Sequence, residues 1–75
     1  MPRLSDLRPG ATAQLLSVGG ERSFRRRLME LGLLPGTPLQ VVRSGGPAGL
    51  VEVIARNCRL SIRKGEAELL HVSES

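Results

Sequence analysis

The chain has 75 residues, 40% of them hydrophobic and a single one aromatic, and it carries a formal net charge of +4 at pH 7. This length favours one domain, residues 1–75, and the lone cysteine excludes an internal disulfide. Because the sequence shows neither a signal-peptide pattern nor an apolar run of about 20 residues, we expect a cytoplasmic protein rather than an exported or membrane-spanning one.

The first predicted elements are a short turn and a strand. Leu4 and Leu7 lie three residues apart on one turn, a spacing that lets both side chains close one end of a core. Residues 11–18 follow, between glycines, and are predicted to form a strand. Its apolar side chains change from one face to the other near the middle, which predicts a β-bulge near Leu16 or Ser17.

The next segment is predicted to be an amphipathic helix with a defined end. Phe24, Leu28 and Leu31 recur at i, i+4 and i+7, so one face of the helix is apolar and is expected to pack on the core. Gly32 follows directly, at the position where a left-handed residue closes a helix without steric cost. Leu33 is then placed to fold back onto the last helical turn.

Four further strands are predicted after the helix, each a short apolar run bounded by turn residues. They span residues 37–43, 50–55, 58–63 and 69–72. Alternation gives two neighbouring strands a shared apolar face, made of Val51, Val53 and Ala55 together with Cys58, Leu60 and Ile62. Arg56 and Asn57 form the two-residue hairpin turn between these strands, since asparagine tolerates positive φ. Residues 64–67 are predicted to form a tight turn, and residues 73–75 to fray.

These elements define the expected fold class. Five short strands, with one α-helix inserted after the first, indicate a mainly β fold in the form of a small, highly curved barrel or roll. Such curvature favours closure, which would remove the exposed sheet edges that otherwise pair with other chains.

Three segments of the chain carry a family resemblance. They are Leu4-x-x-Leu-x-Pro-Gly, Arg27-Leu-Met-Glu-Leu-Gly-Leu-Leu-Pro-Gly-Thr and Leu60-Ser-Ile-Arg-Lys-Gly-Glu-Ala, in this order. From residue 4 to residue 72 the chain resembles the FeoA family, small cytosolic companions of the bacterial ferrous-iron transporter FeoB. The resemblance implies an SH3-like barrel, a role in ferrous-iron uptake, and the cytosolic portion of FeoB as the partner.

The same domain type also resembles the C-terminal module of DtxR-like metal-dependent repressors. We do not expect their helix-turn-helix or dimerisation domain in a chain of this length. The sequence departs from the FeoA pattern at Leu34, where the family commonly has a polar residue. It also departs in the loop at residues 44–49, which is richer in glycine than is usual for the family.

Metal and catalytic sites are not indicated by the sequence. Cys58 is in phase with the inward residues of its strand, so we expect a small buried hydrophobe. His71 is out of phase with Leu70 and Val72, so we expect it to be exposed. The acidic residues show no ligand spacing, and neither a Ser/His/Asp pattern nor a phosphate-binding loop is present. We therefore predict a non-enzyme without metal or cofactor.

Three consecutive arginines are the best sequence evidence for an anionic partner. Arg25, Arg26 and Arg27 spread over about 200° of a helix, so they do not form one stripe. A solvated helix face or an acidic protein partner explains them. The alternative function is a basic SH3-like nucleic-acid-binding module, ribosome-associated or regulatory. Small-barrel binders of this type pair a basic groove with aromatic side chains, whereas Phe24, the sole aromatic residue, is assigned to the core.

Apolar residues outside the core pattern indicate a docking surface. Met29 lies off the apolar helix face, Leu34 lies at a turn, and Ile54 points away from its inward neighbours. Met29 and Leu34 are predicted to lie close together beside arginines, a composition typical of protein–protein contact surfaces. We assign partner binding to Arg25, Arg26, Met29, Leu33 and Leu34, in an adaptor that docks on FeoB.

Overall fold

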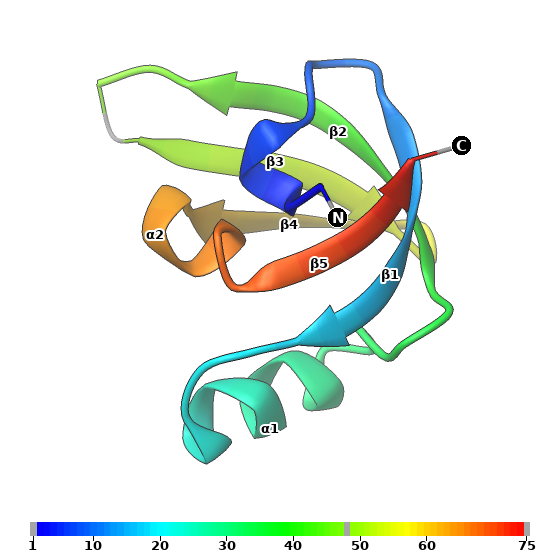
Figure 1. Cartoon of the computed structure of the whole chain (residues 1–75). Helices are drawn as coiled ribbons and strands as arrows, with labels where there is room; N and C mark the ends of the chain where they lie inside the picture. Colours follow the sequence, from blue (N-terminus) through cyan, green and yellow to red (C-terminus); the bar gives the residue numbers. More distant parts are fainter. Residues whose placement is uncertain (1, 48, 75) are drawn as a thin grey trace.

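The computed structural model, which describes residues 2–47 and 49–74, contains one antiparallel sheet of five strands in the order β4-β3-β2-β1-β5 (Figure 1). In chain order the elements are the 3₁₀ turn η1 (Leu4–Asp6), β1 (Thr12–Val18), α1 (Arg22–Glu30), β2 (Pro38–Gly45), β3 (Leu50–Ala55), β4 (Cys58–Arg63), α2 (Lys64–Ala67) and β5 (Leu70–Glu74). The mainly β fold with one longer helix after the first strand is therefore confirmed. The segment predicted as a tight turn at residues 64–67 is a single helical turn.

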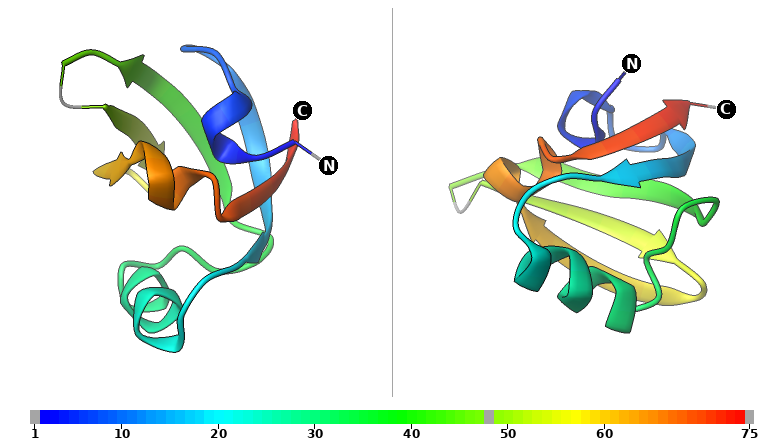
Figure 2. Two further views of the ribbon diagram at one scale, coloured as in Figure 1. Left: turned by 60° about the vertical axis from the view of Figure 1, so that its left-hand side comes forward. Right: turned by 60° about the horizontal axis from the view of Figure 1, so that its bottom comes forward.

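The sheet curves strongly but does not close on itself, because β4 and β5 do not pair, so the expected closure was wrong. Figure 2 shows η1 and α2 on its concave side, while α1 lies apart, beyond the end of β1. β4 and β5 are the two edge strands of the described sheet. The β5 edge is partly covered by the chain start, because the Val72 N–H donates to the Pro2 carbonyl at 3.0 Å and Arg3 bridges His71.

One hydrophobic core fills the concave side of the sheet. It combines both leucines of the N-terminal turn with the inward residues of every strand, with α2 and with two leucines around α1. Its buried members are Leu4, Leu7, Ala13, Leu15, Leu28, Leu33, Leu39, Val41, Val51, Val53, Ala55, Ile62, Ala67, Leu70 and Val72. At about 25 cal/mol per Å² of buried apolar surface, this cluster is the main source of stability in a domain without a disulfide.

The predicted irregularities of the strands are also found. The pairing of β1 with β5 shifts between Leu15 and Ser17, which is the expected bulge. Arg56 and Asn57 have φ values of 54° and 64°, as a two-residue turn with both residues in the left-handed region requires. β4 pairs with β3 so that Val53 lies opposite Leu60, as expected for two residues on the predicted shared face.

The end of α1 follows the predicted geometry, with one correction. Gly32 has φ 93°, its N–H donates to the Met29 carbonyl, and the Leu33 N–H donates to the Leu28 carbonyl at 2.9 Å. These two bonds form a Schellman motif. Leu31, predicted to lie on the buried face, is instead 52% exposed. The prediction was wrong because Gly32 reverses the chain, so that Leu33, 2% exposed, covers the last turn in its place.

Three further predictions were wrong at the strand ends. Cys58 is exposed, since it begins the edge strand β4 at the hairpin, where nothing in the described chain covers it. His71 is half-buried rather than exposed, because Arg3 pairs alongside it. Ser73 and Glu74 do not fray but extend β5, and they pair with Gln14 and Ala13 of β1.

Candidate functional site

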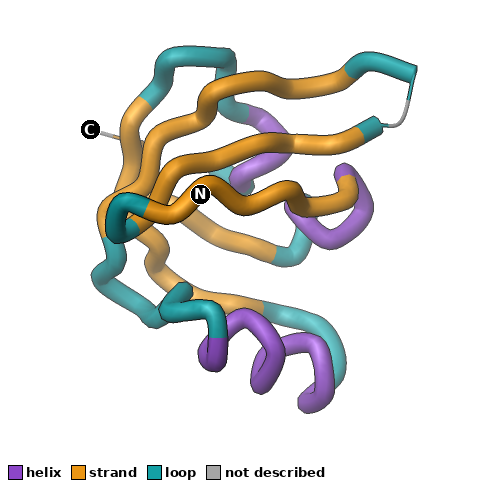
Figure 3. The backbone as a smooth tube through the Cα atoms, turned by 180° about the vertical axis from the view of Figure 1, so that it is seen from behind, coloured by secondary structure: helices purple, strands orange, loops and turns teal. Residues whose placement is uncertain are grey.

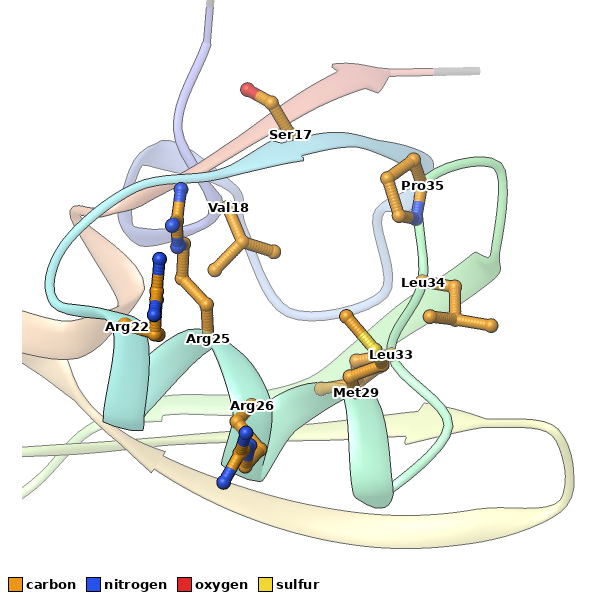
Figure 4. Close-up of a pocket in the computed structure, with 9 residues that line it drawn as sticks. All are labelled: Ser17, Val18, Arg22, Arg25, Arg26, Met29, Leu33, Leu34 and Pro35. Carbon is orange, nitrogen blue, oxygen red and sulfur yellow. The ribbon is translucent and has the colours of Figure 1, made fainter.

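An open groove of about 560 Å³ lies between α1, the end of β1 and the loop that follows α1 (Figure 4). We call it the α1–β1 groove. Its lining residues are Ser17, Val18, Arg22, Arg25, Arg26, Met29, Leu33, Leu34 and Pro35. α1 stands off from the sheet on two connecting loops, as the view from behind shows (Figure 3).

The inner wall of the groove is apolar. Val18 points from β1 toward α1, and Met29 points from α1 toward the strand, so the two side chains face each other across the opening (Figure 4). Leu33 forms the base and is 2% exposed, whereas Met29 is 58% and Leu34 38% exposed. Such exposure of neighbouring large apolar side chains is typical of a contact surface.

Hydrogen bonds hold the loop that carries Leu33 and Leu34 in place. The Thr37 hydroxyl, in a side chain that is 6% exposed, accepts a hydrogen bond from the Leu34 N–H at 3.2 Å and donates one to the Gly32 carbonyl at 3.4 Å. The Gly36 N–H donates to the Leu15 carbonyl of β1 at 2.6 Å. These bonds fix the loop against the strand, so the apolar wall is preformed.

The rim of the groove is basic. Arg22, Arg25 and Arg26 line it together with Met29, and these four residues follow the i, i+3, i+4, i+7 spacing of one helix face. Within the described parts of the chain, none of the three arginines forms a salt bridge. Their guanidinium groups are therefore available to carboxylates of another molecule.

Arg27 belongs to a different face of α1 and has a structural role. Its Nη2 lies 2.6 Å from Glu66 Oε2, and its guanidinium lies 5.6 Å from the centre of the Phe24 ring. Phe24 is half-buried and packs against the core cluster. Arg27 thus ties α1 to α2, leaving the opposite face of α1 for the groove.

All five residues to which the sequence assigned partner binding line this one groove: Arg25, Arg26, Met29, Leu33 and Leu34. The sequence pattern did not indicate the other lining residues, which are Arg22, Val18, Ser17 and Pro35. Arg22 was detectable, since it continues the helical stripe of Arg25, Arg26 and Met29. Val18 could not be detected from the sequence, because only the tertiary fold brings β1 over α1.

Other kinds of site find little support in the described chain. Among residues 2–47 and 49–74, no three His, Cys, Asp or Glu side chains gather closely enough to hold a metal ion. In the same ranges, no buried side-chain nitrogen or oxygen lacks a hydrogen-bond partner. Over those residues, too, no helix has the length and apolar character needed to cross a membrane.

A curved five-stranded antiparallel sheet, with a helix after its first strand and a groove beside that helix, defines a small SH3-like protein with a candidate binding groove. Residues 3–74 match the family described as the FeoA domain. The chain belongs to the FeoA family.

Solved structures agree with this assignment. The FeoA protein from Chlorobium tepidum is 40% identical with a TM-score of 0.89, over 97% of this chain and 70% of that one. Stenotrophomonas maltophilia FeoA complexed with zinc is 28% identical with a TM-score of 0.82, over 100% of this chain and 96% of that one. It is described as a prokaryotic SH3 domain protein and candidate ferrous iron transport activating factor. No curated protein matches the chain.

A manganese-dependent transcriptional repressor shares the fold at a TM-score of 0.90 and 17% identity. The match covers 99% of this chain but 41% of the repressor. At this identity the likeness concerns the fold alone, and it agrees with the predicted resemblance to a module of metal-dependent repressors.

Proposed function

We propose that this protein is a non-enzymatic adaptor of ferrous-iron uptake, which works in the cytoplasm by docking on the cytosolic portion of the FeoB transporter. Membership of the FeoA family supports the iron-uptake role. The description of the Stenotrophomonas maltophilia relative as a candidate ferrous iron transport activating factor supports an accessory part in it.

The observation that carries the proposal is the composition of the α1–β1 groove. It combines an exposed methionine and leucine with three arginines that have no ion-pair partner in the described chain. Protein–protein contact surfaces are enriched in methionine and arginine around an apolar centre. A preformed groove of this kind also keeps the entropic cost of docking low.

An adaptor without catalytic groups influences a transporter only through differential binding. If it binds one state of the transporter ten times more tightly than another, it shifts their equilibrium by about 1.4 kcal/mol. Groove residues that contact one state more closely than the other would therefore set both affinity and regulation.

Protein docking is favoured over the alternative of nucleic-acid binding. Single-stranded nucleic acids bind basic grooves through stacking on aromatic side chains, each worth about 1–3 kcal/mol per base. The sole aromatic residue, Phe24, is half-buried beneath Arg27 and does not line the α1–β1 groove. The groove instead offers aliphatic and thioether surface, which suits apolar side chains of a protein.

The test is a pull-down of detergent-solubilised FeoB by the tagged protein. Met29→Asp and Leu34→Asp should fold normally but retain much less transporter, because each places a charge in the apolar wall. Ile54→Asp is the matched control, since Ile54 is 37% exposed and Leu34 38%, but Ile54 lies outside this groove. Equal retention of FeoB by all three variants would refute the assignment of this surface.

A further inference from the structure

We propose that the α1–β1 groove takes a short acidic segment of the partner in an extended conformation, with carboxylates on the arginine rim and an apolar side chain between Val18 and Met29. This inference rests on the proposed function, because it names the kind of segment by which the transporter would be recognised. It follows from three features of the groove, namely its charge, its apolar wall and its open strand edge.

The three arginines on the groove face of α1 are placed unfavourably for this helix, although Glu21 stands at its N-cap. Its first turn has no acidic residue and begins with Arg22, and Arg25 and Arg26 follow on the same face. Cations near a helix N-terminus oppose the helix dipole, and like charges three or four residues apart repel each other. Since none of the three arginines has an ion-pair partner in the described ranges, carboxylates of a ligand would relieve both effects.

The apolar wall of the groove favours an apolar side chain on the ligand. Val18 and Met29 face each other across the opening, above Leu33 (Figure 4). Burial of an aliphatic side chain between them removes apolar surface from water on both partners. The favoured segment therefore alternates acidic and apolar residues, rather than carrying charge alone.

The strand edge above the groove favours an extended segment. β1 pairs with β2 through residues 12–14, and Leu15 bonds to the loop at Gly36 and Thr37. Ser17 and Val18 pair with β5 on the other side of the strand. On the β2 side no strand of the described sheet pairs with residues 17 and 18, and both residues line the groove. An added strand is a common mode of peptide recognition at such edges.

Overlapping 15-residue peptides that tile the cytosolic sequence of the transporter provide the test. Each fluorescein-labelled peptide is titrated into the 75-residue protein, and its anisotropy is followed. We expect the peptides that bind to contain Asp or Glu beside aliphatic residues. In ¹⁵N-labelled protein, the amide signals of Ser17, Val18 and Leu34 should shift on binding, while that of Ile54 should not.

The double variant Arg25→Glu/Arg26→Glu should raise the Kd at least tenfold. Arg8→Glu/Arg59→Glu changes the net charge equally at exposed positions outside the groove, and should leave the Kd within twofold. The groove variant should melt no lower than the wild type, because acidic residues suit the first turns of a helix. Loss of binding would then not be due to unfolding.

The remaining outcomes separate this inference from the proposed function. If the protein retains FeoB but binds no peptide, or binds peptides without acidic residues, the inference fails and the proposed function stands. If it retains neither FeoB nor peptides, both fail. If the arginines mediate binding to phosphatidylglycerol vesicles while no peptide binds, the groove recognises lipid head groups, and the acidic-segment inference is overturned.

Discussion

Replacement of Leu28 by alanine tests how α1 is attached to the rest of the protein. Leu28 is 3% exposed and is the one buried side chain of α1. Buried Leu→Ala substitutions cost about 2–5 kcal/mol, depending on how far the neighbouring structure can collapse into the space. Because α1 stands off from the sheet on two loops, it can move inward, so we expect the lower part of this range, about 2–3 kcal/mol.

A loss of about 2–3 kcal/mol in the free energy of unfolding is large for so small a chain. At about 4–8 °C per kcal/mol for a domain of this size, the melting temperature should fall by about 8–24 °C. The measurement is a thermal melt followed by far-UV circular dichroism, repeated in urea. Leu31→Ala is the control, since Leu31 lies three residues away and is 52% exposed; its cost should stay below about 0.5 kcal/mol. Coincident melts of the two variants would refute the attachment of α1 through Leu28.

Three other outcomes follow from the structure. Gly20→Ala should destabilise the protein more than Gly10→Ala in the same melts. Both glycines have positive φ, but only at Gly20 would the new Cβ meet side chains, namely Leu69 at 2.9 Å and Phe24 at 3.2 Å. Glu66→Gln should lower the free energy of unfolding by less than about 1 kcal/mol, because its partner Arg27 has a side chain that is 59% exposed. The loss should be smaller in high salt, and a loss that does not depend on salt would contradict this. Anaerobic calorimetry with ferrous iron should show no stoichiometric heat, and anisotropy with short RNA or DNA no saturable binding tighter than about micromolar; a one-to-one iron isotherm or a nanomolar nucleic-acid curve would overturn the adaptor proposal.

The strands were predictable because their signals are local. Alternation of apolar residues and the turn at Arg56 and Asn57 depend on a few neighbouring residues, and these gave β3 and β4 their bounds. Periodicity was less reliable where an element ends. Leu31 continues the helical spacing and still has helical backbone angles, but the left-handed Gly32 reverses the chain directly after it, and Leu33 covers the last turn instead. The exposure of Cys58 shows the same limit, since alternation says which face a residue shares, not whether that face is covered.

The candidate site was predictable in composition but not in shape. Unpatterned apolar residues beside arginines pointed to Met29 and Leu34, and the structure places both in one groove. The opposite wall depends on how β1 passes over α1, which no local pattern encodes. The role of Thr37 in fixing the loop was also missed, although its hydroxyl bonds to main-chain groups only three and five residues away.

The two edges of the sheet also differ in how readily they should open. β5 is paired with β1 on one side and partly covered by Pro2 and Arg3 on the other, whereas no strand of the described sheet follows β4. Amide hydrogens exchange with solvent through local opening, which costs least where few neighbours hold a segment. Deuterium should therefore enter β4 before β5, and the exposed thiol of Cys58 stands at the start of that first strand to open.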